Sequence, residues 1–380
     1  MGNASVFEGN ILSDYEFYAP EFLVEINGRE LDPATKGDIL QVKVVMDIDN
    51  MTGFELTLNN WDDDAFDFKY TNNRDLVDLC GLVSVKMGYA EKLLSMVEGR
   101  ITSISPRFPE SGPPSLGVSG QDGMIVLRDR KPADGEPMSY RNLTDGQIAQ
   151  RIAERNQLGV EADTDGPVHE LVVQRNQDDA TFLMERAKRI DYDVFVRTDP
   201  DSGESTLHFV KPTDGRDGRP IRVYELVWGE SLINFTPTMT AAHQVSSVTV
   251  RGWNARTKSV ITYTSTEDDL PNAGSGTSGP AAAACLGPGR QEVTIDAPVA
   301  SEDEARELAR SLLRERAYEF ITGNGRVVGL PDLRPGDNIS LQRLGPRFSG
   351  TYYVTKVDHS LGGSGYFTTF DVRRTHEEEA

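Results

Sequence analysis

Apolar and polar residues alternate over roughly the first hundred positions, the pattern of strands that bury one face. Phe22, Val24 and Ile26 share one face and precede Asn27-Gly28, a strong hairpin signal. The alternation returns in residues 42–46, 54–58, 83–89 and 96–104. We therefore predict an antiparallel β-barrel over residues 1–105.

Residues 106–230 change to a mixed pattern of helices and strands. Thr144 and Gln147 have the spacing of a capping box, and apolar residues at helical spacing follow them. Phe182 and Leu183 lie in a second segment of helical spacing, and a strand-turn-strand pattern follows in residues 194–209. This stretch predicts a small α+β domain.

Strand patterns resume in residues 231–264 and near the C-terminus. Pro335 fixes its own φ and Gly336 tolerates a positive φ, so Leu-Arg-Pro-Gly-Asp predicts a turn. Alternation in residues 339–341, 352–356 and 370–372 predicts the strands that follow. We predict a second antiparallel barrel from residues 231–264 and 325–380, in which Val248 and Val250 pair with residues beyond 325.

Residues 265–324 read as an insertion in that barrel. Gly274–Gly289 is rich in Gly, Ala, Ser and Pro, a composition that predicts a mobile loop. Ser301 and Glu304 then have the spacing of a second capping box, which predicts a helix running to about residue 320. The glycines of Gly323-Asn-Gly325 are expected to end this helix.

The order of these motifs resembles the late control protein D family, the baseplate hubs of contractile phages, which includes the hub half of type VI secretion spike proteins. The C-terminal segments GLPDLRPGD (329–337), GTYYVTKVDH (350–359) and GYFTTF (365–370) carry much of the likeness. The positions taken as structural signatures of the family are Gly28, Trp61, Gly88, Tyr89, Gly99, Phe182, Leu183, Gly329, Pro335, Gly336, Gly350, Tyr352, His359, Gly365, Tyr366 and Phe370.

The resemblance implies a mainly β protein with an α+β insert: two tube-like antiparallel β-barrels plus a small α+β domain. It implies a structural, non-enzymatic hub, a homotrimer that adapts a sixfold tail tube to a threefold spike. The expected partners are a separate spike protein, a tail tube or tube-initiator protein and baseplate wedge proteins. Such a hub is assembled in the cytoplasm and becomes part of a phage tail baseplate or an extracellular injection particle. The resemblance leaves open whether the particle is a phage, a bacteriocin or an injection system.

Composition narrows the classes of partner. The chain of 380 residues has a formal net charge of −21, which opposes phosphate binding, so no nucleic-acid surface is expected. No apolar run approaches the ~20 residues of a membrane helix, so no membrane segment is expected. Cys80 and Cys285 are expected to be reduced apolar side chains rather than a disulfide.

The sequence offers little catalytic chemistry. None of the five histidines has a second His or Cys at metal-ligand spacing, so no metal, cofactor or catalytic residue is assigned. His359 follows Val357 on one strand face and is expected to be structural. One alternative is a baseplate-associated cell-wall hydrolase, which requires a cleft with desolvated carboxylates. Another is a carbohydrate-binding β-sandwich, which predicts a cluster of exposed aromatic side chains.

Overall fold

The computed structural model describes residues 19–90, 92–128, 138–198, 204–212, 223–254, 257–270, 276–286 and 292–378. It is mainly β, and its sheets are largely antiparallel. Within these ranges, none of the helices is long and apolar enough to cross a membrane.

The elements up to residue 210 are β1 (Pro20–Ile26), β2 (Arg29–Glu30), α1 (Pro33–Gly37), β3 (Ile39–Asp47), β4 (Asn50–Asn59), β5 (Trp61–Asp62), β6 (Asp67–Phe68), β7 (Leu82–Tyr89), β8 (Lys92–Arg107), β9 (Ser115–Asp122), α2 (Met124–Arg128), β10 (Met138–Tyr140), α3 (Asp145–Arg155), β11 (Gly159–Ala162), β12 (Val172–Gln174), α4 (Asp179–Ile190), β13 (Asp193–Thr198) and β14 (Ser205–Val210). The later elements are β15 (Val223–Val227), β16 (Leu232–Met239), β17 (Ser247–Asn254), β18 (Ser259–Ser265), η2 (Glu267–Asp269), α5 (Gly279–Ala283), η3 (Ala284–Leu286), β19 (Glu292–Asp296), α6 (Glu302–Tyr318), β20 (Ile321–Val328), β21 (Asn338–Gln342), β22 (Gly350–Gly362) and β23 (Gly365–Arg374).

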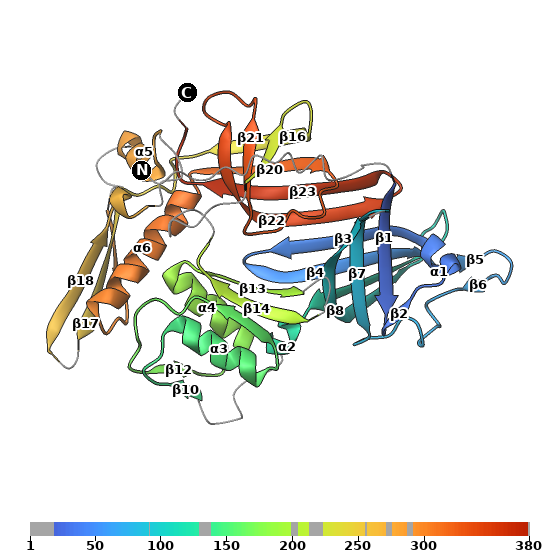
Figure 1. Ribbon diagram of the computed structural model, residues 1–380, viewed down its shortest axis with the longest axis horizontal. Coiled ribbons are helices and arrows are strands. Elements are labelled where there is room, and N and C mark those ends of the chain that lie inside the picture. The colour runs from blue at the N-terminus through green and yellow to red at the C-terminus, as the bar shows by residue number, and fades with distance from the viewer. Residues whose placement is uncertain are drawn as a thin grey trace.

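One large sheet, here called the main sheet, contains strands from both ends of the chain. It has 13 strands, and its path runs β16-β20-β23-β22-β3-β4-β9-β8-β7-β1-β2, with β21 and β15 attached beside β22. The link between the two ends is the antiparallel pairing of β22 with β3, in which His359 lies opposite Val44. Figure 1 shows β22 and β23 directly above β3 and β4. The predicted N-terminal and C-terminal strand sets are therefore hydrogen-bonded to each other.

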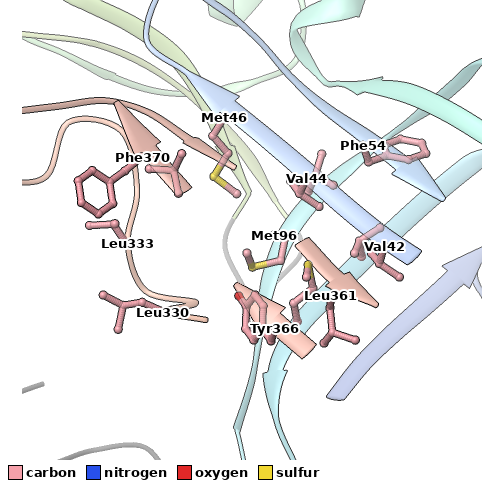
Figure 2. Close-up of a cluster of buried hydrophobic side chains, with 14 of the residues drawn as sticks. Val42, Val44, Met46, Phe54, Met96, Leu330, Leu333, Leu361, Tyr366 and Phe370 are labelled. Carbon is pink, nitrogen blue, oxygen red and sulfur yellow. The ribbon is translucent and has the colours of Figure 1, made fainter. Parts of the chain in front are cut away.

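The apolar faces of both strand sets pack into a single core. Val42, Val44 and Met46 of β3 are buried, as their alternation predicted. They share a cluster with C-terminal residues, including Leu333, and each such buried side chain contributes ~1.5–3 kcal/mol. Figure 2 shows this cluster, to which β3, β4, β8, β22, β23 and the loop after β20 contribute. Burial of apolar side chains thus joins the two strand sets in addition to their backbone pairing.

The α+β part (α2–α4 and β10–β14) has its own core and lies below the main sheet in Figure 1. The predicted capping box of α3 is present: Thr144 Oγ1 accepts from the Gln147 backbone N–H at 3.3 Å, and Gln147 Oε1 accepts from the Thr144 N–H at 3.0 Å. Phe182 and Leu183 are buried in this core, and Phe182 stacks on Tyr140. The capping box and the helical spacing of apolar residues were therefore sufficient to predict these two helices from the sequence.

The predicted pairing of Val248 and Val250 with residues beyond 325 is wrong. Their strand, β17, pairs with β18 and β19 in a separate three-stranded sheet. The inward face of this sheet packs on the apolar side of α6, where Ala305 and Ala309 are buried. β17 therefore finds its partners in the neighbouring β18 and, within the insertion, in β19.

The prediction of a mobile loop at 274–289 is wrong for residues 276–286, and the rest lies outside the described residues. Ser278 caps α5 by accepting from the Ala281 N–H at 3.1 Å, and the Gly279 N–H donates to the Thr375 carbonyl at 3.0 Å. A Cβ on Gly279 would lie 2.0 Å from Gln244 Oε1. The small residues that suggested disorder instead allow close packing.

The glycines at 323 and 325 do not end the helix. Helix α6 ends at Tyr318, before both of them, and they lie in β20. A Cβ would lie 2.4 Å from the Phe235 ring at Gly323 and 2.4 Å from the Phe370 ring at Gly325. The glycines therefore make room for aromatic rings on the sheet.

Candidate functional site

The signature positions named from the sequence are spread over the fold. Gly28 and Gly336 lie in turns with φ of 74° and 89°, as the turn signals predicted. The others lie in β5 (Trp61), β7 (Gly88, Tyr89), β8 (Gly99), α4 (Phe182, Leu183), the segment between β20 and β21 (Gly329, Pro335), β22 (Gly350, Tyr352, His359) and β23 (Gly365, Tyr366, Phe370). Their role as family signatures remains a prediction.

Four of these positions meet where the ends of the chain join. The Tyr89 hydroxyl donates to the Gly329 carbonyl at 2.8 Å, and its ring lies 5.8 Å from that of Tyr366. The Tyr366 hydroxyl lies 3.1 Å from His359 Nδ1. A Cβ on Gly329 would lie 2.2 Å from the Tyr366 ring, so only glycine fits there without a shift. We call Tyr89, Gly329, His359 and Tyr366 the junction cluster.

His359 is fully buried, and both its nitrogens have partners. Nε2 lies 3.1 Å from the Leu333 carbonyl, which only an N–H can approach, so Nδ1 accepts from the hydroxyls of Tyr366 and Thr368, each at 3.1 Å. Burial, and then the charge of Arg334, holds the pKa of His359 well below its usual range. The imidazole is therefore neutral, and its hydrogen bonds organise the core.

A second histidine, missed by the sequence reasoning, joins the α+β part to α6. His169 Nε2 lies 3.0 Å from Asp145 Oδ2 of α3, and Nδ1 lies 2.7 Å from Glu304 Oε1 of α6. Burial lowers the pKa of His169, but the hydrogen bonds that the imidazole donates to the Asp145 and Glu304 carboxylates outweigh burial, so the pKa is raised. The predicted capping box of α6 is only half formed, because Glu304 accepts from the Ala300 N–H and His169 instead of returning to Ser301.

A polar cleft of about 840 Å³ lies where α4, α6 and the main sheet meet. Asp193 of β13 lines the cleft, and its carboxylate accepts a hydrogen bond from the buried Tyr353 hydroxyl of β22. Burial, and then the neighbouring Asp193 charge, raises the pKa of Tyr353 far above its usual value. The Arg373 guanidinium lies 3.9 Å over the Tyr318 ring. These groups hold the walls of the cleft together. In the described ranges, no group of three or more His, Cys, Asp or Glu could hold a metal ion.

A known family matches most of the chain. The model described as the Alg8 N-terminal domain matches residues 19–362. The chain belongs to this family. No curated protein sequence matches it.

Solved structures share the fold at low sequence identity. The prophage MuSo2 43 kDa tail protein from Shewanella oneidensis has 14% identity and a TM-score of 0.67, with 94% of this chain and 98% of that chain covered. A tail protein from Neisseria meningitidis MC58 has 13% identity and a TM-score of 0.65, with 94% and 97% covered. The E. coli c3393 protein, described as a component of the type VI secretion system, has 15% identity and a TM-score of 0.56, with 94% and 78% covered. The resemblance to tail and baseplate hub proteins is confirmed at the level of the fold.

Proposed function

We propose that this protein is a structural hub of a contractile tail or injection system, assembled in the cytoplasm and then built into the particle. The observation that carries the proposal is a fold shared with phage tail proteins over nearly the full length of both chains. The same fold occurs in a protein described as a type VI secretion component. The proposed role is mechanical rather than catalytic.

The proposed architecture keeps the two tube-like barrels and reassigns some of the strands that form them. The first barrel takes its strands mainly from residues 1–105 and adds β9, so the α+β domain narrows from the predicted 106–230 to α2–α4 and β10–β14. The second barrel takes β15, β16 and β20–β23, whereas β17–β19 and α6 form an adjoining unit, in keeping with their pairing. The β22–β3 pairing fits two tubes fused along one side.

The proposed assembly is a homotrimer bound to a separate spike, to the tail tube or its initiator and to baseplate wedge proteins. Two similar barrels in each of three subunits would present six barrels to a sixfold tube and threefold symmetry to a spike. Among the described strands β16 ends the main sheet, and beyond the bridge between Trp228 and Leu232 its outer edge would offer backbone groups for pairing with a neighbouring subunit. Repulsion opposes assembly, because each chain has a formal net charge of −21.

The contacts between the parts of one chain support a mechanical role. His169 contacts Glu304, Tyr353 contacts Asp193, and Ser311 Oγ of α6 donates to a backbone carbonyl of α4 at 2.5 Å. Each contact is part-buried or buried and joins segments more than one hundred residues apart in sequence. Such contacts fit a subunit that transmits force without its parts separating.

Mass photometry of the purified protein with its spike across a salt series tests the proposal. We expect a 3:3 complex that forms more readily as salt screens the charges, and imaging that shows six barrels around an open channel. Ile233→Lys on β16 should weaken the trimer, whereas Val328→Lys on the internal strand β20 should not, although the two side chains are similarly exposed at 47% and 41%. A monomer at every salt concentration, or a closed hexamer, would refute the hub function.

A further inference from the structure

Four aromatic side chains gather at one extremity of the molecule. Trp61, Phe66 and Phe68 lie on the β5–β6 hairpin, and Phe108 follows β8. Ring centroids are 6.4 Å apart for Trp61–Phe66, 5.6 Å for Trp61–Phe68 and 5.2 Å for Phe68–Phe108. Phe66 is 79% exposed and Phe108 is 61% exposed. We call these four residues the aromatic tip, and Figure 1 shows its hairpin projecting far from the α+β part.

The backbone conformation at Phe66, within the aromatic tip, does not favour the folded state of this chain. Phe66 has a φ of 52°, a left-handed conformation that is disfavoured for a bulky side chain. A residue held in this way commonly marks a functional surface. The strained backbone displays the ring to solvent, where it gains little from burial within this chain.

The base of the hairpin is rigid. The buried Asn60 side chain accepts from the backbone N–H groups of Tyr70 at 2.9 Å and Thr71 at 3.2 Å. The Asn60 N–H donates to the Pro114 carbonyl at 3.0 Å, which ties the hairpin to the loop after Phe108. The aromatic tip is therefore preorganised, which lowers the entropy cost of binding a partner.

The charge around the tip selects the kind of partner. Residues 61–68 read WDDDAFDF, with four aspartates, and residues 108–114 add one glutamate, so acidic groups outnumber the two flanking cations, Lys69 and Arg107. Asp63 and Asp64 are exposed. This charge repels anionic lipids, nucleic-acid phosphates and a second copy of a chain with a formal net charge of −21.

We propose that the aromatic tip docks into another protein subunit, in an apolar pocket rimmed by lysine and arginine. Exposed aromatic anchors on a rigid support are typical of binding hot spots, and the surrounding aspartates would complement the basic rim. This inference goes beyond the hub function, because it holds whichever assembly the protein joins.

Photo-crosslinking in intact cells that produce the protein tests the proposal. A photoreactive phenylalanine at Phe66 should give one crosslinked partner protein, and the crosslinked peptide should lie beside an apolar pocket with lysine or arginine at its rim. Asp63→Lys with Asp64→Lys should reduce this adduct at least tenfold, and so should Phe108→Ser. The same photoreactive residue at Val260 of β18, which is 65% exposed, is the matched control and should not give this adduct.

Other outcomes overturn the proposal. A crosslink to another copy of this chain would assign the tip to self-association. Binding of the purified protein to phosphatidylcholine vesicles that is lost in Phe66→Ser would assign it to lipid, and equivalent binding to peptidoglycan would assign it to carbohydrate. The absence of an adduct, or the same adduct from Val260, would show that the tip has no specific protein partner. Thermal unfolding of each variant verifies that the fold is kept.

Discussion

Replacing Gly329 with alanine tests the junction cluster most directly. The new Cβ would lie 2.2 Å from the Tyr366 ring, far inside van der Waals contact. The ring is buried and has little room to move, because it packs against Tyr89 and its hydroxyl contacts His359. Either the ring or the backbone of residue 329 must shift.

The expected cost has two contributions. Overpacking a buried site costs about 1–3 kcal/mol. A shifted Tyr366 ring also loses its hydrogen bond to His359, and a buried polar group left without a partner costs about 1–3 kcal/mol. We expect Gly329→Ala to lower the free energy of unfolding by roughly 2–6 kcal/mol.

Urea unfolding of wild type, Gly329→Ala and Gly363→Ala measures this loss. Gly363 lies in the β22–β23 turn, where nothing lies within 4 Å of an added Cβ, so its alanine variant is the matched control and should be close to wild type. In a Tyr366→Leu background, Gly329→Ala should cost at least about 1 kcal/mol less, because the clashing ring is absent. A Gly329→Ala protein as stable as wild type would refute the packing argument.

Three further predictions concern contacts between the parts of the chain. Folding raises the pKa of His169, so the free energy that protonated His169 contributes to stability is fully present below the unfolded pKa of about 6.5. This contribution is lost as the pH rises through the folded pKa. Urea unfolding from pH 6 to 9 should show the loss in wild type and not in His169→Gln. Gly279→Ala should displace the buried Gln244 side chain and lower the free energy of unfolding by about 1–3 kcal/mol, and a Tm equal to wild type would show that residues 276–286 contribute nothing to the fold. Tyr353→Phe leaves the buried Asp193 carboxylate without this donor and should cost about 1–3 kcal/mol, with faster hydrogen exchange in β13; unchanged exchange would contradict a role in joining the cleft walls.

Local signals in the sequence predicted much of the fold. Alternation placed Val42, Val44 and Met46 on a buried face, and the capping box of Thr144 and Gln147 marked the start of α3. These signals depend on residues a few positions apart, so one sequence contains them in full. The same reasoning failed for Val248 and for residues 276–286, because their partners are chosen by packing against distant segments.

The candidate sites were less predictable for the same reason. His169 lies 24 positions from Asp145 and 135 from Glu304, and no motif links the three residues. In the aromatic tip, only Trp61 is among the predicted signature positions. The exposure of Phe66 and the contact of Phe68 with Phe108 depend on how Asn60 places two hairpins.

The pairing of β22 with β3 has a consequence for synthesis on the ribosome. Met46 of β3 pairs with Val357, which leaves the ribosome about three hundred residues later. The main sheet therefore has a very high contact order. Until then one edge of β3 is open, and an open edge promotes pairing with other chains. We expect nascent chains stalled before residue 350 to be protease-sensitive in β3 and to aggregate when released, whereas chains that include β22 and β23 resist both. Strands that are made late thus protect a strand that is made early.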